Sequence, residues 1–366
     1  MDAPGRRERD ALMALQAVIL AGGMGTRLRP LTLNRPKPVV PLLNVPFLHH
    51  QLALLGAHGI RDVILSVSHM PEVIRSIMGD GRAAGVRLRY VVEGEPLGTA
   101  GGVRNAADLV EGRVVVLNGD VLTDVDLGAM LAAHEAKRAL ATIFLAPVEN
   151  PTAYGLVELE ADGRVHRFLE KPGWDEVTTD TINAGIYVLE RELLDLIPKG
   201  QPYSMEREFF PDLLERRVPF FGYVPRAYWL DIGTAAKYLQ AHHDLLGRLV
   251  QTPVTPPGRP RPEGWLDASA EIDPTVRLRG PVVIGPGCRL EPGVVAGPGL
   301  VLGPGCRLGR GTQAESAVLW EEVAVEAGAR LHGCLVGRGC RIGAHADVGP
   351  DRVLGDGSTL SPYSRL

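Results

Sequence analysis

The first 287 residues of this 366-residue chain contain no cysteine, because its four cysteines all lie further on, at Cys288, Cys306, Cys334 and Cys340. This absence excludes a thiol nucleophile and a thiolate-bound metal from the first part of the chain. Long apolar runs are missing too. None approaches the ~20 residues of a membrane-spanning helix, and the run Ala17 to Ala21 is too short for a secretory core. We therefore expect a cytoplasmic protein with no membrane partner.

The chain also lacks an excess of positive charge. Its formal net charge is −4, so it has no general attraction for nucleic acid, and we expect no nucleic-acid partner. Lysine is scarce, with five residues against 34 arginines. The few lysines are worth inspecting, because a compact ammonium differs from a guanidinium as a phosphate ligand.

A chain of this length is expected to form two domains. From about residue 16 to residue 247, short apolar runs such as Val63 to Val67 and Val114 to Leu117 alternate with longer amphipathic stretches. This alternation predicts an α/β domain with a Rossmann-like, doubly wound mixed sheet whose strands are largely parallel. Ligands of such sheets bind beyond the carboxyl ends of the strands, which directs attention to the loops after Leu20 and Leu117.

A second pattern begins after residues 251–264, a stretch with five prolines that predicts a stiff linker. Aliphatic residues then recur every six positions from Ile284 to Leu308 and, after two one-residue phase slips, as far as Leu360. The period predicts a parallel β-helix of hexapeptide repeats. The expected organisation is an N-terminal extension (1–15), a first domain (16–250), the linker (251–264) and the β-helix (265–366).

Two of the cysteines are 18 residues apart, which is three hexads. Cys288 and Cys306 should therefore stack in successive coils, about ~4.8 Å apart. A disulfide is geometrically conceivable there, but the cytoplasmic interpretation favours buried thiols that fill a narrow core.

A glycine-rich turn follows the first predicted strand and runs from Ala21 to Arg27 (A-G-G-M-G-T-R). Glycines in such a turn let backbone amides approach phosphate oxygens. The spacing matches neither a dinucleotide fingerprint nor a Walker loop. The glycines alone also fit an ordinary strand-to-helix turn, whereas Arg27 and the following Arg35-Pro36-Lys37-Pro38 favour a phosphate site.

This turn resembles the signature of the sugar-phosphate nucleotidyltransferases, which join a sugar 1-phosphate to a nucleoside triphosphate and release pyrophosphate. Over residues 17–246 the motifs are most similar to those of the mannose-1-phosphate guanylyltransferases, which also carry a C-terminal left-handed β-helix. The further motifs, in order, are E-P-L-G-T-A-G (95–101), L-N-G-D (117–120), Y-G (154–155), F-L-E-K-P (168–172), I-N-A-G (182–185) and W-L-D-I-G (229–233).

The resemblance implies a set of catalytic residues. A sugar 1-phosphate is already an anionic nucleophile, so cations that overcome charge repulsion are expected to do most of the catalysis. Arg27 and Lys37 would hold the triphosphate and Lys171 the sugar phosphate. Asp120 and Asp231 would bind Mg²⁺, which prefers hard oxygen ligands. The other interpretation of each aspartate is a helix cap.

The resemblance also implies binding residues. Glu170, Asn183 and the backbone at Gly155 would face the sugar. Glu93 could accept hydrogen bonds from N1–H and the amino group of guanine, which favours GTP and mannose 1-phosphate. Thymidylyl or uridylyl transfer to glucose 1-phosphate stays open. The residues expected around the nucleotide are Ala21, Gly22, Gly23, Gly25, Thr26, Glu93, Gly98, Thr99 and Gly119.

Two other functions fit parts of the pattern. A non-catalytic regulatory homologue would bind sugar nucleotide without turnover, but the retained catalytic cations argue for activity. His332 and His345 in the repeats suggest acyl transfer as an alternative function, which the R-P-K-P motif disfavours. We expect a homo-oligomer through the β-helix, because stacked coils end in exposed strand edges.

Overall fold

The computed structural model describes residues 15–366, which form two compact units. The first unit contains residues up to 23 together with 50–229, and the second contains 24–49 together with 230–366. All but the last residue of the expected N-terminal extension lie outside the described residues. The boundaries placed at 250 and 264 stay predictions.

The first unit is built on a mixed sheet of nine strands, in which β10, β9, β11, β6, β1, β4 and β5 lie in that order, β8 pairs with β11, and β12 pairs with β8. Four strands run parallel, as their apolar sequences predict: β1 (Gln16–Leu20), β4 (Asp62–Val67), β5 (Arg87–Val92) and β6 (Val114–Asn118). The remaining strands of this sheet are β8 (Ala141–Pro147), β9 (Gly155–Leu159), β10 (Val165–Glu170), β11 (Thr181–Leu189) and β12 (Phe220–Tyr223).

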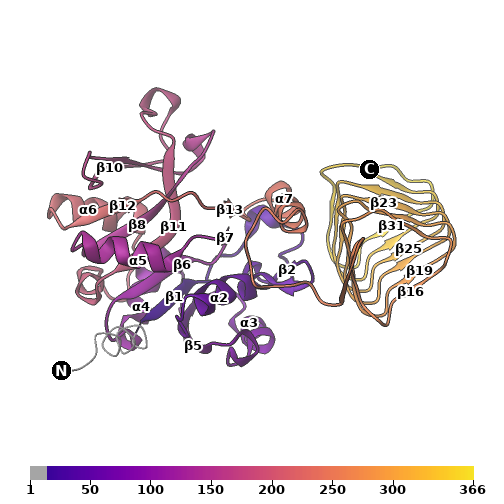
Figure 1. The fold of residues 1–366 in the computed structure, drawn as a ribbon, viewed down its shortest axis with the longest axis horizontal. Helices are drawn as coiled ribbons and strands as arrows, with labels where there is room; N and C mark the ends of the chain where they lie inside the picture. Colours follow the sequence, from indigo (N-terminus) through magenta and orange to yellow (C-terminus); the bar gives the residue numbers. More distant parts are fainter. Residues whose placement is uncertain (1–14) are drawn as a thin grey trace. The chain divides into compact units, whose positions relative to one another are not determined.

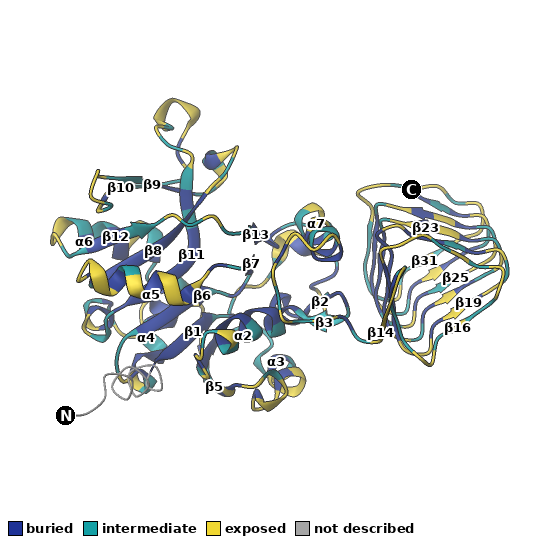
Figure 2. Cartoon of the chain, viewed as in Figure 1, coloured by how far each residue is buried: buried dark blue, intermediate teal, exposed yellow. Residues whose placement is uncertain are grey.

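The central strands are buried on both faces, which explains why their sequences are almost continuously apolar. Val18, Ile64 and Val116 belong to a core that also includes apolar residues of helices α4 and α6 and of a π-helical turn. Helices cover the sheet in Figure 1, and the buried strands appear dark in Figure 2. Apart from 3-10 turns, the helical segments are α2 (Phe47–Ala57), whose first three residues belong to the second unit, α3 (Pro71–Met78), α4 (Gly98–Ala106), α5 (Leu127–Ala136), the π-helical turn (Met205–Phe209) and α6 (Phe210–Glu215). The predicted doubly wound mixed sheet is confirmed.

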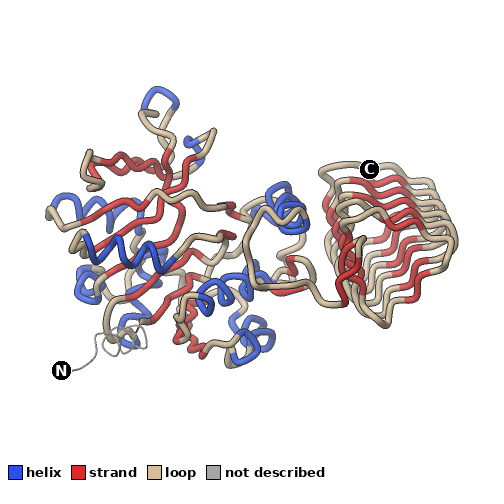
Figure 3. Tube along the Cα trace, viewed as in Figure 1, coloured by secondary structure: helices blue, strands red, loops and turns tan. Residues whose placement is uncertain are grey.

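The second unit begins with a loop segment. It contains a short 3-10 turn (Lys37–Val39) and a hairpin of β2 (Pro41–Leu42) and β3 (Val45–Pro46). The chain returns to this unit within β13 (Trp229–Asp231) and continues into α7 (Ala235–Leu246). After α7 the chain is strand and loop only (Figure 3).

Those strands form a left-handed parallel β-helix with three faces. The first face contains β15 (Gly264–Leu266), β18 (Val282–Ile284), β21 (Val301–Leu302), β24 (Val318–Leu319), β27 (Leu335–Val336) and β30 (Val353–Leu354), and β14 (Arg259–Arg261) pairs antiparallel with β15 at its edge. The second contains β16 (Glu271–Ile272), β19 (Arg289–Leu290), β22 (Arg307–Leu308), β25 (Ala324–Val325), β28 (Arg341–Ile342) and β31 (Thr359–Leu360). The third contains β17 (Arg277–Leu278), β20 (Val295–Ala296), β23 (Gln313–Glu315), β26 (Arg330–His332) and β29 (Asp347–Val348).

The hexad pattern matches this interior. Ile284 pairs with Leu302, eighteen residues later, whereas Leu302 pairs with Leu319, seventeen residues later, because one corner is shortened. Such corners account for the phase slips in the sequence. All four cysteines are free and buried, as expected for thiols that fill the core. Among the described residues, no helix combines the length and apolar character that crossing a membrane requires.

A matched pair of substitutions in β22 tests the β-helix core. Leu308 is fully buried and its neighbour Arg307 is exposed. Leu308→Ala should lower the free energy of unfolding by about 2–5 kcal/mol, because it removes buried methyl groups and leaves a cavity. Arg307→Ala should change it by less than about 0.5 kcal/mol. Urea denaturation of both variants measures the difference. Equal effects would contradict the assignment of Leu308 to the interior and of Arg307 to the surface.

Candidate active site

The residues expected to act on the substrates fall into two groups, one in each unit. The first unit holds the residues assigned to the base and the sugar, together with Asp120 and Lys171. The second unit holds the segment from Gly25 to Lys37 and Asp231. Each group is built from loops that follow strands.

The glycine turn begins where β1 ends beside β4 and β6. The amide of Ala21 donates to the carbonyl of Ser66 at 2.8 Å, and the amide of Gly119 donates to the carbonyl of Leu20 at 3.0 Å. A Cβ atom on Gly119 would collide with that same Leu20 carbonyl oxygen. The hydroxyl of Ser68 donates to the carbonyl of Gly22 at 2.7 Å. Glycine at position 119 is therefore required by the close approach of two strand ends.

The Glu93 carboxylate is buried and held on both oxygens. Its Oε1 accepts from the Ser66 hydroxyl at 2.8 Å, and its Oε2 accepts from the amide of Leu97 at 3.0 Å. Cβ atoms built on Gly22 and Gly102 would lie 3.5 and 3.0 Å from Oε1. The structure thus brings Glu93 next to the glycine turn, in a fixed orientation and with the backbone close around it.

Helix α4 starts directly after this point, at Gly98. That glycine has φ +72°, and a Cβ on it would lie 2.8 Å from the carbonyl oxygen of Tyr203. The next residue, Thr99, accepts from the amide of Met205 at 2.8 Å and donates to Glu206 Oε2 at 2.9 Å. The Thr99 hydroxyl therefore ties the segment assigned to the nucleotide to the π-helical turn that carries Glu206.

The sugar residues lie at the ends of β9, β10 and β11. Gly155 pairs with Glu170, and a Cβ on Gly155 would lie 3.1 Å from Glu170 Oε2. Lys171 follows, with its Nζ 3.9 Å from Glu170 Oε1. Burial raises the pKa of the Glu170 carboxyl, and the nearby charge of Glu206 raises it further. The structure therefore brings Gly155, Glu170 and Lys171 together and adds a second carboxylate that the sequence did not assign.

Asn183 is fixed at both ends of its amide. Its Oδ1 accepts from the amide of Gly185 at 2.9 Å, and its Nδ2 donates to the Tyr187 hydroxyl at 3.0 Å. Tyr187 is fully buried, which raises its pKa well above the usual value, and the charge of Asp120 adds to this shift. Asp120, Asn183 and Tyr187 therefore share one neighbourhood. The sequence analysis missed Tyr187, since an apolar strand with a tyrosine gives no separate signal.

In the second unit, the Arg27 guanidinium and the Asp231 carboxylate both lie close to Gly233. A Cβ on Gly233 would be 2.6 Å from Asp231 Oδ2 and 3.1 Å from Arg27 Nη2. Asp231 is buried and forms an ion pair with Lys237 on α7. Lys237 was also missed; its position six residues after Asp231 and the scarcity of lysine are the only signals that could have indicated it.

Lys37 lies in the same unit, buried in the 3-10 turn that it opens. A Cβ on Gly25, whose φ is +61°, would lie 3.0 Å from Lys37 Cβ, and the Thr32 hydroxyl donates to the carbonyl of Gly25 at 2.7 Å. Gly25 and Lys37 are therefore neighbours. Thr26 and Arg27 follow Gly25 in an exposed turn.

Within the described part of the chain, no three histidine, cysteine or acidic side chains are close enough together to hold a metal ion by themselves. Magnesium commonly keeps water and substrate phosphate oxygens as ligands and takes only one or two carboxylates from the protein. Asp120 in the first unit and Asp231 in the second both have hard carboxylate oxygens, and the magnesium site assigned to them from the sequence stays a prediction.

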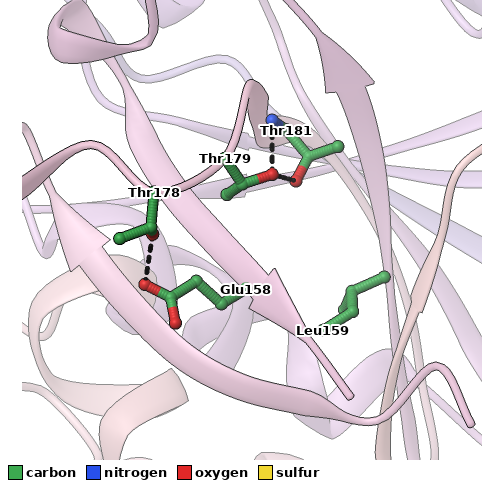
Figure 4. A pocket seen from close by; sticks show the side chains of 5 residues that line it. All are labelled: Glu158, Leu159, Thr178, Thr179 and Thr181. Carbon is green, nitrogen blue, oxygen red and sulfur yellow. Dashed lines mark hydrogen bonds between the residues drawn. The ribbon is translucent and has the colours of Figure 1, made fainter. Parts of the chain in front are cut away.

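A separate pocket of about 370 Å³ opens between β9 and β11. Figure 4 shows Thr178 donating to Glu158 at 2.6 Å and the hydroxyls of Thr179 and Thr181 3.0 Å apart. None of the residues assigned to the substrates lines this pocket.

Residues 16–248 match the family described as nucleotidyl transferase, and residues 278–363 match the GMPPB C-terminal domain. The chain belongs to the nucleotidyl transferase family. It is 40% identical to mannose-1-phosphate guanylyltransferase of Mycobacterium tuberculosis, over 86% of this chain and 82% of the relative. It is 36% identical to UTP–glucose-1-phosphate uridylyltransferase of Synechocystis, over 91% of each chain. HddC of Yersinia pseudotuberculosis is structurally similar, with a TM-score of 0.56 and 29% identity over 63% of this chain and 99% of that protein.

Membership confirms the resemblance, the nucleotidyltransferase activity and the two-part fold that the sequence predicted. Enzymes of this family typically use a divalent metal ion. A nucleoside triphosphate and a sugar phosphate are substrates that fit the family. The roles of the individual residues stay predictions.

The two neighbouring carboxylates allow a test of the sugar site by pH. The sequence assigns Glu170 to the sugar, and an ionised carboxylate accepts hydrogen bonds from hydroxyls more strongly than a protonated one. In that role, kcat/KM for the sugar 1-phosphate should fall as the pH drops through the raised pKa of Glu170. Glu206→Gln removes a charge that raises this pKa, and the acid limb should move to lower pH.

Initial rates between pH 4.5 and 8 measure this shift. Glu208→Gln, two residues further along the same turn, is the control and should leave the limb where it is. If the acid limb of the kcat/KM profile does not move in Glu206→Gln, the ionisation of Glu170 does not set this limb, and the proposed role of Glu170 in sugar binding is contradicted.

Proposed function

We propose that this enzyme makes GDP-mannose and pyrophosphate from GTP and mannose 1-phosphate. Its relatives include mannose-1-phosphate guanylyltransferases that match nearly the whole chain. The observation that carries the choice of guanine is the Glu93 carboxylate, buried beside the glycine turn with both oxygens fixed. A carboxylate is an acceptor only, which suits the two adjacent N–H donors of guanine.

The chemistry is a single displacement at phosphorus. An oxygen of the sugar phosphate forms a bond to the α-phosphorus, and the bond between that phosphorus and the oxygen bridging to the β-phosphorus breaks. Pyrophosphate leaves with the electron pair. No proton has to move to create the nucleophile, so the protein contributes alignment and positive charge.

We assign the cations by the groups they would meet. Arg27 has a planar fork that can hold two oxygens of the triphosphate, and Lys37 would supply a second positive charge to the same phosphates. Lys171, beside Glu170, would bind the sugar phosphate. Thr26 and the amides of the glycine turn would bind the nucleotide, and Gly155, Glu170 and Asn183 the sugar.

We also propose that the metal ion is Mg²⁺. Asp120 and Asp231 would hold Mg²⁺, which would supply positive charge to the α-phosphate when bound. The ion pair with Lys237 orients the Asp231 side chain. Homo-oligomer formation through the β-helix and a cytoplasmic location also stay predictions.

A second candidate is uridylyl or thymidylyl transfer to glucose 1-phosphate, since one relative is a UTP–glucose-1-phosphate uridylyltransferase. Pyrophosphate release with GTP, UTP, TTP and ATP, each with mannose 1-phosphate and glucose 1-phosphate, separates the candidates. Highest kcat/KM for GTP with mannose 1-phosphate is expected, and a preference for UTP or TTP with glucose 1-phosphate would overturn the proposal.

Glu93→Gln gives a direct test of base recognition. The glutamine carbonyl can take the hydrogen bond from Leu97, and its NH₂ can donate to Ser66, whose own proton remains available for the carbonyl of Gly102. The fold should therefore tolerate the change. Loss of a charged acceptor should lower kcat/KM for GTP by about 10- to 100-fold, which corresponds to about 1.5–3 kcal/mol.

The effect on UTP should be much smaller, so the ratio of the two values of kcat/KM is the quantity to measure. An equal loss with both nucleotides would show that Glu93 supports the structure without reading the base.

Asp120→Asn tests the metal assignment. Removing one charged ligand should lower kcat by about 10². The matched control is Asp126→Asn at the N-cap of α5, where asparagine caps as well as aspartate. Activity should also vanish with EDTA and return with Mg²⁺. Full activity of Asp120→Asn in Mg²⁺ would remove Asp120 from the metal site.

A further inference from the structure

One coil of the β-helix departs from its own repeat. From β18 to β30 on the first face, the residue that follows the strand is glycine in four coils, at Gly285, Gly303, Gly337 and Gly355, but is Trp320 after β24. The next two residues of this coil are Glu321 and Glu322. Glu322 occupies the position at which the four other coils have a second glycine. Glu322 keeps the left-handed backbone of those glycines, at φ 62°. The repeat fold does not call for these side chains.

Trp320 contacts a segment of the chain almost three hundred residues earlier. Its ring lies 4.9 Å from the Arg35 guanidinium carbon, and Arg35 forms an ion pair with Glu321. Trp320 is 1% exposed, and Arg35 and Glu321 are 22% exposed. A cation that is stacked on an aromatic ring and paired with a carboxylate away from bulk water is held firmly.

The other edge of the same indole holds the far end of that segment. Trp320 Nε1 donates to the Tyr238 hydroxyl at 3.3 Å, and this hydroxyl donates to the carbonyl of Pro41. Tyr238 is fully buried, which raises its pKa and keeps the hydroxyl protonated as a donor. Residues 35 and 41 are thus both anchored to one side chain, and Lys37 lies between them.

Other contacts from the β-helix hold the flanks of this segment. Asn44 Nδ2 donates to the carbonyl of Leu302 at 2.7 Å, and Pro30 packs against Gly355. All of these residues belong to the second unit.

We propose that Trp320 and Glu321 are positioning residues for nucleotidyl transfer, which fix the Arg35–Pro41 segment and thereby the Lys37 ammonium on the triphosphate. This rests on the proposed role of Lys37. Arg35 is a structural anchor in this arrangement and not a phosphate ligand. The β-helix then contributes to the rate of the reaction through one coil, whatever its role in assembly.

Trp320→Gly restores the residue that the four glycine coils carry and removes the ring under Arg35 and the donor to the Tyr238 hydroxyl. In the full-length protein, hydrogen exchange of the peptide spanning residues 35–46 should become at least about tenfold faster, since the segment opens locally at lower cost. Misplacement of a catalytic group by about 1 Å can cost up to about 10² in rate, so kcat should fall by at least about tenfold. KM for the sugar 1-phosphate should stay within about twofold, because Lys171 and Glu170 are not tied to this coil.

Two further variants and a control complete the test. Trp320→Phe keeps the ring under Arg35 and should recover most of the lost kcat. Glu321→Gln, isosteric and partly exposed, guards against misfolding of the glycine variant and should shift exchange and kcat the same way by about threefold. The control is Arg289→Gln, which breaks an exposed ion pair with Glu271 in the β-helix and should change neither readout.

Unchanged exchange in a folded Trp320→Gly or Glu321→Gln protein overturns the anchoring. Faster exchange with unchanged kcat overturns the positioning role, as does an equal loss of kcat in Arg289→Gln. A wild-type protein that is inactive with every nucleotide would instead overturn the proposed function, while hydrogen exchange would still test the anchoring.

Discussion

Repulsion between two phosphorylated substrates is the constraint on which this enzyme is built. Two unit charges 4 Å apart interact with about 1 kcal/mol in water and about 4 kcal/mol near a protein surface, and each substrate carries more than one charge. The nucleophile needs no activation, so the barrier lies in bringing anions together and holding them in line. A protein meets this demand with fixed cations. The chain keeps lysine at Lys37 and Lys171 although it uses arginine almost everywhere else.

Environment separates the acidic residues into different tasks. Glu93 is clamped by two donors and can serve only as a fixed acceptor. Burial raises the pKa of the Glu170 carboxyl, and the charge of the neighbouring Glu206 raises it further, so the sugar contact proposed for Glu170 is expected to depend on pH. Asp231 is paired with Lys237 and lies close to Arg27. The same functional group thus has different neighbours at each position, and we base the different roles proposed for these carboxylates on those neighbours.

The sequence predicted the local and periodic features of the structure. It missed contacts between residues that are far apart in the chain. Apolar runs indicated the parallel strands, and the hexads indicated the β-helix down to its two shortened corners. The glycines at 22, 98 and 119 were identified from motifs, but the reason for Gly98, a carbonyl of Tyr203 from a distant segment, has no sequence signature. Tyr187 and Lys237 were missed for the same reason: each acts through one partner, Asn183 or Asp231, that only the fold brings near.

The coil that contains Trp320 shows that residues which break a sequence repeat can make contacts outside the repeat domain. In a repeat domain, each position is expected to follow the rule that stacking imposes, so a departure that costs stability needs a compensating contact. Glu322 adopts a left-handed backbone that glycine reaches without strain, at a cost on the order of 1 kcal/mol. Glu322 pairs with Arg338 within the β-helix, whereas the side chains of Trp320 and Glu321 make contacts outside it, with Arg35 and Tyr238. In the proposed arrangement, the irregular coil serves the loop that it holds and would tie the repeat domain to the chemistry through Lys37.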